Sequence, residues 1–150
     1  MNLQAAQCAW RALGPSVRVL DTTDATAAYG RDTTAVERRI GGALVILDRS
    51  AMPEVMRIAG RYEVSVYPIS TGRNWGYGTA LPTDNDSVIL DLSGLREILH
   101  FDAELGVVTV EPGVTQGMLS DFLDEGGHPF LVPVTGAGPE CSLLGNALER

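Results

Sequence analysis

The stretch PISTGRNWGYG at residues 68–78 has the composition of a loop that binds an anion. It follows an apolar run directly, and glycines this dense let a backbone bend sharply or approach a ligand closely. Successive backbone N–H groups in such a bend form a nest that attracts a phosphate. Side-chain hydroxyl, guanidinium and amide groups add donors, although these also serve to tie a loop to neighbouring carbonyls. The residues with these donors are Ser70, Thr71, Gly72, Arg73 and Asn74.

The sequence of this loop and of the rest of the chain does not match two common nucleotide-binding motifs. The glycines fall at Gly72, Gly76 and Gly78, which does not match GxGxxG, and the chain has no GK[ST] sequence. A plain Rossmann fingerprint and a P-loop are therefore not supported. A tight turn without a ligand remains the alternative interpretation of such a strand exit.

A strand, a helix and a second strand position this loop. The continuous apolar run ALVILD at 43–48 is typical of a strand buried on both faces. Ser50 is the predicted cap of the next helix, and Pro53 falls in its first turn. VSVYPI at 64–69 is the second strand, so the unit is βαβ with parallel strands. The loop leaves the carboxyl end of that strand, where open α/β sheets bind ligands.

The remaining elements follow from periodicity and turn residues. Before and after the βαβ unit we predict a helix at 2–13, an irregular stretch at 20–35 and a strand at 87–92. A hairpin of 98–101 with 107–111 follows, and then a helix that is capped by Thr115 and ended by Gly126–Gly127. The last predicted elements are a short strand at 130–134, an irregular loop at 135–142 and a final helix from Ser142. The acidic residues Asp84, Asp86 and Asp91 are predicted to be solvated turn charges.

Length and composition indicate one globular domain. The chain has 150 residues, of which 45% are hydrophobic and 20% charged. The formal net charge of −8 argues against a nucleic-acid partner. The two cysteines and two histidines lie apart, so neither a disulfide framework nor a metal site is expected. Neither a signal peptide nor a membrane span is evident, so we expect a cytoplasmic protein without a membrane partner.

Four segments, in order, resemble the vanillyl-alcohol oxidase and p-cresol methylhydroxylase family of FAD-dependent oxidoreductases. They are PISTGRNWGYG at 68–78, VILDLSGLREIL at 88–99, VTVEPGVTQGMLSDFL at 108–123 and SLLGNALER at 142–150. The similarity is strongest to the branch that oxidises 4-alkylphenols. It implies an α+β fold, the N-terminal portion of a PCMH-type FAD-binding domain. A small parallel βαβ subdomain would be followed by mixed or antiparallel strands and helices.

The resemblance also divides the chain. Residues 1–150 would form a partial FAD-binding domain, with residues 1–40 as a helical and irregular lead-in. The remainder of the FAD-binding domain and a separate substrate domain would lie outside it.

The resemblance assigns FAD as cofactor and gives each motif a role. Tyr77 would be the catalytic residue that helps to bind a substrate phenolate, and its alternative role is packing. The turn at 111–113 would approach the adenosine part of FAD, and the segment from Ser142 would approach the flavin or its ribityl and phosphate parts. A plain strand end and a helix cap are the respective structural alternatives. The implied cofactor-binding residues are Ile69, Ser70, Thr71, Gly72, Arg73, Asn74, Glu111, Pro112, Gly113, Ser142, Gly145, Asn146 and Glu149.

The implied reaction is hydride transfer from the benzylic carbon of a para-substituted phenol to flavin N5. Oxygen or a cytochrome would then accept the electrons, and the protein would self-associate as a homo-oligomer. Two alternatives remain: an FAD-dependent hydroxy-acid or sugar oxidoreductase, and a non-catalytic truncated remnant that self-associates.

Overall fold

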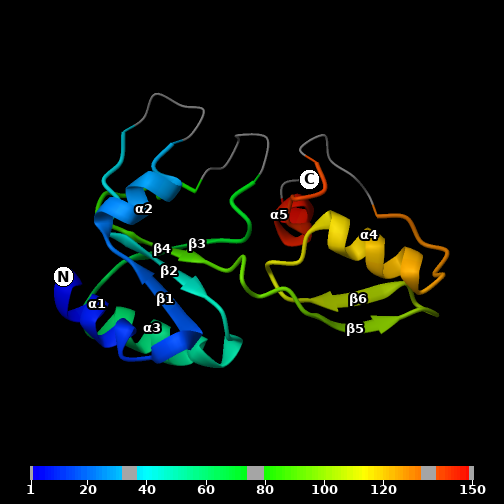
Figure 1. Cartoon of the computed structure of the whole chain (residues 1–150), viewed down its shortest axis with the longest axis horizontal. Coiled ribbons are helices and arrows are strands. Elements are labelled where there is room, and N and C mark those ends of the chain that lie inside the picture. The colour runs from blue at the N-terminus through cyan, green and yellow to red at the C-terminus, as the bar shows by residue number, and fades with distance from the viewer. Residues whose placement is uncertain (1, 32–36, 74–79, 133–137, 149–150) are drawn as a thin grey trace.

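The computed structural model describes residues 2–31, 37–73, 80–132 and 138–148, and all structural statements below concern these ranges. The elements form two lobes that lie side by side (Figure 1). The N-terminal lobe contains the elements from α1 to β4, and the hairpin lobe contains those from β5 to α5.

The elements of the N-terminal lobe are α1 (Leu3–Arg11), the 3₁₀ turn η1 (Gly14–Ser16), β1 (Val17–Leu20), α2 (Thr22–Tyr29), β2 (Gly42–Ile46), the 3₁₀ turn η2 (Arg49–Ala51), α3 (Met52–Arg61), β3 (Val66–Ile69) and β4 (Val88–Asp91). Those of the hairpin lobe are β5 (Ile98–Asp102), β6 (Val107–Val110), α4 (Gln116–Glu125) and α5 (Leu143–Leu148).

A four-stranded sheet with the order β1-β2-β4-β3 forms the centre of the N-terminal lobe. β2, β4 and β3 are parallel, and β1 pairs with β2 in the antiparallel sense. The predicted βαβ unit of β2, α3 and β3 is therefore confirmed, with β4 between its two strands. Every residue of β2 and of β4 is buried, as expected for strands covered on both faces.

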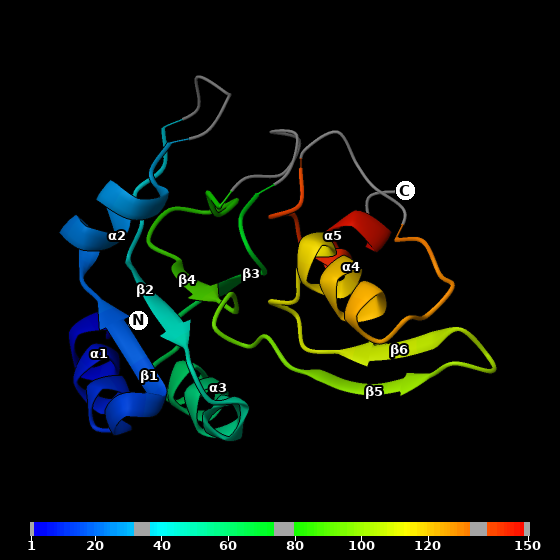
Figure 2. The same ribbon diagram turned by 45° about the vertical axis from the view of Figure 1, so that its right-hand side comes forward.

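Helices cover both faces of this sheet. α1 and α3 pack on one face, where the indole N–H of Trp10 donates to the carbonyl of Val55 over 3.1 Å. α2 covers the other face through Ala25, which packs in a second cluster with Ile89 of β4. Figure 2 shows α1 and α3 on one side of the sheet and α2 on the other.

The hairpin lobe is held by aromatic contacts between its hairpin and α4. Phe101 of β5 meets Phe122 of α4 edge to face, with ring centroids 5.5 Å apart. The rings of His128 and Phe130 also contact Phe101. The predicted cap of α4 is confirmed, because Thr115 Oγ1 accepts a hydrogen bond from the N–H of Met118.

Three local predictions are wrong. The stretch predicted to be irregular at 20–35 contains the end of β1 and the whole of α2, because Asp21 caps the N–H groups that open this helix. Ser50 does not cap α3: Asp48 instead accepts from the Ser50 N–H and opens η2. Residues 130–132 form no strand, and the ring of Phe130 packs against Phe101. The rest of the predicted strand, 133–134, lies outside the described residues.

In the part of the chain that the structure describes, no helix has the length and apolar character needed to cross a bilayer.

Candidate functional site

The carboxyl ends of the parallel strands meet at one edge of the sheet. Val45 of β2 and Ile69 of β3 both lie in register with Asp91, the last residue of β4. The carbonyl of Ile69 accepts a hydrogen bond from the N–H of Leu92 over 2.9 Å. The loop that begins at Ser70 therefore starts where open α/β sheets bind their ligands.

Three segments that are distant in sequence converge on the carbonyl oxygen of Pro112. The hydroxyl of Ser70, at the start of the loop, donates to this oxygen. The hydroxyl of Ser142, which precedes α5, lies 3.4 Å from the same oxygen. Ser142 also forms an isolated antiparallel bridge with Thr115, which precedes α4. The structure thus brings together Ser70, Pro112 and Ser142 from three separate motifs.

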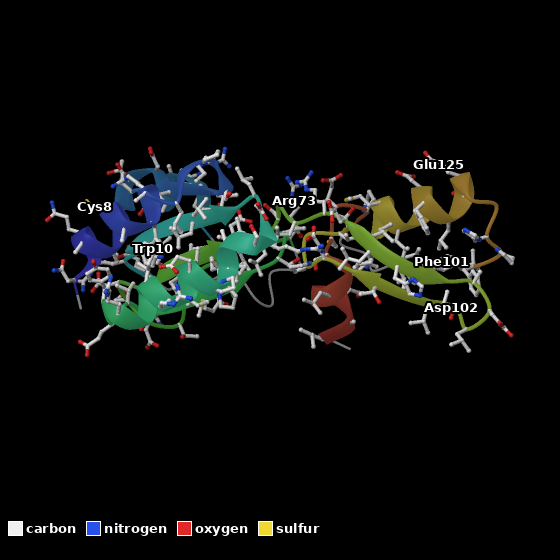
Figure 3. All side chains as sticks on the ribbon, turned by 90° about the horizontal axis from the view of Figure 1, so that it is seen from below. Cys8, Trp10, Arg73, Phe101, Asp102 and Glu125 are labelled. Atoms are coloured by element: carbon white, nitrogen blue, oxygen red, sulfur yellow. The ribbon has the colours of Figure 1, made fainter. Side chains whose placement is uncertain are left out.

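The described part of the loop continues through Thr71, Gly72 and Arg73. The hydroxyl oxygen of Thr71 is buried and has no hydrogen-bond partner among the described residues. Gly72 has a φ of +65°, a left-handed conformation that favours glycine. Arg73 is exposed and lies where the two lobes meet (Figure 3). Two further predicted residues, Asn74 and Tyr77, lie outside the described ranges.

The turn after β6 is fixed by contacts within the protein. Glu111 is buried, and its Oε2 accepts a hydrogen bond from the N–H of Glu97 over 2.9 Å. The N–H of Gly113 donates to the carbonyl of Leu95 over 2.7 Å. A Cβ at Gly113 would lie 2.5 Å from that same oxygen, so this position accepts only glycine. One carboxylate oxygen of Glu111 thus already accepts a hydrogen bond from the protein.

The segment from Ser142 confirms the predicted helix cap. The Ser142 hydroxyl accepts a hydrogen bond from the N–H of Gly145 over 3.0 Å. The N–H of Asn146 donates to the Ser142 carbonyl over 3.1 Å. Gly145 and Asn146 are therefore joined to the Pro112 junction through Ser142. Glu149 lies outside the described residues.

The sequence prediction missed a hydrogen-bonded pair at this sheet edge, the half-buried Tyr29 and the buried Asp91. Asp91 is 8% exposed, so its prediction as a solvated turn charge is wrong. The hydroxyl of Tyr29, from α2, donates to Asp91 Oδ2 over 2.6 Å, and the N–H of Ser93 donates to Oδ1 over 2.8 Å. Burial, and then this hydrogen bond, raise the pKa of Tyr29 well above its usual value, so the phenol stays a donor. The sequence feature that could have indicated a buried carboxylate was the position of Asp91 at the end of an otherwise apolar strand.

Comparison with known proteins identifies the class of domain. Residues 43–150 match the family model described as FAD binding domain. The chain therefore belongs to the family of FAD-binding domains, and FAD is its cofactor.

Two curated relatives and one solved structure indicate to which flavoproteins this FAD-binding domain is similar. The chain is 35% identical over 148 residues to 1'-carboxy-chondrochloren decarboxylase of Chondromyces crocatus, covering 99% of this chain and 27% of that protein. It is 30% identical over 144 residues to the 4-cresol dehydrogenase (hydroxylating) flavoprotein subunit of Pseudomonas putida, covering 94% of this chain and 28% of that protein. The structure of p-cresol methylhydroxylase with substrate bound matches with a TM-score of 0.89 and 29% identity, over 99% of this chain and 30% of that one.

These similarities confirm the predicted fold, the PCMH-type FAD-binding domain of the vanillyl-alcohol oxidase and p-cresol methylhydroxylase family. The chain spans less than a third of the length of the curated relatives that it matches.

The described residues fit the anionic diphosphate of FAD. The buried hydroxyl of Thr71 has a donor to offer, and such an unpaired group costs free energy until a ligand accepts from it. Gly72 adopts the left-handed backbone conformation that an anion-binding nest uses. The exposed guanidinium of Arg73 adds positive charge beside this bend.

Proposed function

We propose that this chain is the FAD-binding part of a flavin oxidoreductase that oxidises para-substituted phenols. The observation that carries the proposal is the loop at the carboxyl edge of the sheet, with the unpaired buried hydroxyl of Thr71. The similarity to the flavoprotein subunit of 4-cresol dehydrogenase supports the substrate class. FAD would supply a hydride acceptor for the benzylic carbon of the substrate.

The residues of this chain would hold the cofactor and orient it. The loop from Ile69 to Asn74 would bind the diphosphate, with backbone N–H groups and the Thr71 hydroxyl as donors. The Ser70 hydroxyl donates to the Pro112 carbonyl, which would fix the start of the loop. Ser142 would close the site from the side of the hairpin lobe, because its hydroxyl lies at the same carbonyl.

Tyr77 would hold the substrate. A phenol that donates to a phenolate oxygen favours the ionised substrate, and the ionised form gives up a hydride more readily. We therefore propose Tyr77 as the catalytic residue of this chain, on the basis of the loop motif GRNWGYG.

The first test is FAD binding. The protein expressed from its full native coding sequence is mixed with FAD, excess cofactor is removed by gel filtration, and the visible absorption spectrum is recorded. We expect retained flavin bands. A folded protein that retains no flavin would remove the basis of the proposal.

The second test concerns the substrate and uses the protein expressed from its full native coding sequence. The FAD-loaded protein is mixed anaerobically with 4-cresol, and bleaching of the flavin band is followed. Bleaching by 4-cresol, weakened in Tyr77→Phe, is the expected result. Bleaching by a 2-hydroxy acid or a sugar instead would support the alternative classes.

A second candidate reaction is oxidative decarboxylation. It is favoured by the 35% identity to a protein named as a decarboxylase. In this case the full protein would release carbon dioxide from an aryl-substituted carboxylic acid, and 4-cresol would leave the flavin oxidised. Repeating the anaerobic experiment with an aryl-substituted carboxylic acid in place of 4-cresol, and measuring both the carbon dioxide released and the bleaching of the flavin band, distinguishes the two reactions.

We also propose that the 150 residues are a partial domain. Residues 1–40, expected to be a helical and irregular lead-in, contribute β1 to its sheet and α1 and α2 to the two faces of that sheet. The share of the relatives that the chain covers supports this view. Oxygen or a cytochrome would serve as electron acceptor, and the protein would form a homo-oligomer. Stopped-flow reoxidation and analytical ultracentrifugation test these two statements.

A further inference from the structure

A buried carboxylate and a guanidinium join the two lobes beside the candidate site. Glu111, at the end of β6, is 7% exposed, and its Oε1 lies 3.5 Å from the guanidinium of Arg49. Arg49 belongs to η2, which follows β2 at the carboxyl edge of the four-stranded sheet. The contact therefore connects that edge of the N-terminal lobe to the hairpin lobe.

Opposite charges meet at this contact, with the buried carboxylate of Glu111 facing the more exposed guanidinium of Arg49. A buried carboxylate is costly unless a cation and hydrogen-bond donors compensate it. For Glu111 the donor is the N–H of Glu97, and the cation is Arg49. The carboxylate of Glu97 also lies 3.8 Å from the same guanidinium, but it is exposed and depends less on it.

The residue that this pair holds leads directly into the Pro112 junction. The N–H of Glu111 donates to the carbonyl of Glu97, and the N–H of Val114 donates to the carbonyl of Glu111. These bonds fix the turn that contains Pro112, to whose carbonyl the hydroxyls of Ser70 and Ser142 are directed. A displacement of Glu111 would therefore be passed to the start of the FAD-binding loop.

We propose that Arg49 and Glu111 are positioning residues for FAD: their ion pair sets the place of the Pro112 carbonyl and thereby the affinity of the loop for the cofactor. This inference rests on the proposed function, because it assumes that FAD binds at this loop. It assigns Glu111 a role through the turn, in place of direct contact with the cofactor.

The test compares FAD dissociation constants for charge-removing variants of the protein expressed from its full native coding sequence. Arg49→Met keeps most of the apolar stem, and Glu111→Gln keeps an acceptor for the Glu97 N–H. We expect each to weaken FAD binding by about tenfold, and the double variant to be no weaker than either alone, because both break one coupling. Arg49→Lys should restore much of the affinity. Arg57→Met is the control, since Arg57 forms an exposed ion pair with Glu54 on α3.

Independent losses that add in the double variant would mean that Arg49 and Glu111 do not act through one coupling, and would overturn the inference. Unchanged affinity in Arg49→Met would overturn it as well. If the wild-type full-length protein binds no FAD, the proposed function itself fails, and the wild-type measurement alone shows this outcome.

Amide hydrogen exchange supplies a readout that does not depend on the cofactor. In Arg49→Met we expect faster exchange at Gly113 and Val114, whose N–H groups hold the turn, and unchanged exchange at Leu44 in β2. Equal acceleration at all three positions would indicate general destabilisation and contradict a local positioning role.

Discussion

The hydroxyl of Tyr29 donates a hydrogen bond to the buried carboxylate of Asp91 over 2.6 Å, and this bond ties α2 to the carboxyl edge of the sheet. Tyr29→Phe removes the hydroxyl, so Oδ2 of Asp91 no longer accepts this hydrogen bond. We expect a loss of about 1–3 kcal/mol in the free energy of unfolding at neutral pH. Urea denaturation followed by circular dichroism measures it, and a change near zero would contradict the importance of this bond.

The same pair predicts a dependence on alkaline pH. Burial and the bond to Asp91 raise the pKa of Tyr29, so the folded protein holds the phenolic proton more tightly than the unfolded chain does. The resulting stability is complete below the unfolded tyrosine pKa of about 10, and it is lost as the pH rises further. Melting temperatures measured across this range should fall less steeply in Tyr29→Phe than in the wild type. Parallel declines would contradict the assignment.

Gly113 and Gly60 form a pair of substitutions with opposite expected signs. A Cβ at Gly113 would meet the carbonyl oxygens of Leu95 and Leu92 at 2.5 and 2.7 Å, and backbone atoms cannot move aside cheaply. We expect Gly113→Ala to destabilise the protein by roughly 2 kcal/mol or more. At Gly60, within α3, no atom of the described residues lies within 4 Å of the Cβ position apart from its chain neighbours and the backbone of its own helix. Gly60→Ala should therefore stabilise the protein by about 0.5 kcal/mol. Denaturation midpoints of the two variants that shift in the same direction would contradict this prediction.

Trp10 is fully buried and donates its indole N–H to the carbonyl of Val55. Trp10→Phe loses this bond and leaves part of the indole volume empty, so we expect a cost of about 2–3 kcal/mol. Leu131→Ala is the control, because Leu131 is 97% exposed and its truncation should change stability by less than about 0.5 kcal/mol. Chemical denaturation measures both variants. Trp10→Phe also leaves Trp75, within the glycine-rich loop, as the single tryptophan for fluorescence.

Thr71→Val should change stability and cofactor affinity in opposite directions. The hydroxyl of Thr71 is buried without a partner among the described residues, so its removal should stabilise the cofactor-free chain by about 0.5–1 kcal/mol. The same change removes a donor from the FAD site, and we expect affinity to fall about tenfold. Thr71→Ser keeps the hydroxyl and should bind FAD nearly as the wild type does. Equal affinity in the valine variant would place this hydroxyl outside the FAD site.

The parts of the fold that follow from local sequence were predictable. The apolar runs of β2 and β4 are continuous because both faces of these strands are covered. Such a run can be recognised in the sequence without knowing which segments pack against it. The cap of α4 at Thr115 is local too, since its acceptor and donor are three residues apart. Ser50 was predicted to cap α3, but Asp48, which lies two residues earlier and is equally suited to capping, caps η2 instead.

Contacts between distant segments were not predictable in this way. Asp91 resembles a solvated acid in the sequence because its partner, Tyr29, lies 62 residues earlier. Ser70 and Ser142, which meet at the Pro112 carbonyl, likewise lie 42 and 30 positions from it in the sequence. The sequence therefore indicated each motif but not the junction between them. The predicted roles of Asn74, Tyr77 and Glu149 stay predictions, because these residues lie outside the described ranges.

The order β1-β2-β4-β3 has a consequence for how the nascent protein folds during synthesis. β4 is the last of these strands to leave the ribosome, yet it occupies the place between β2 and β3. Before residue 88 has been made, β2 and β3 have no strand to join them, and Ile69 has no neighbour across the sheet. Pro112 and then Ser142 must follow before the start of the loop gains its other contacts. The junction at Pro112 is therefore completed only after Ser142 has been made, and FAD capture would follow formation of the sheet.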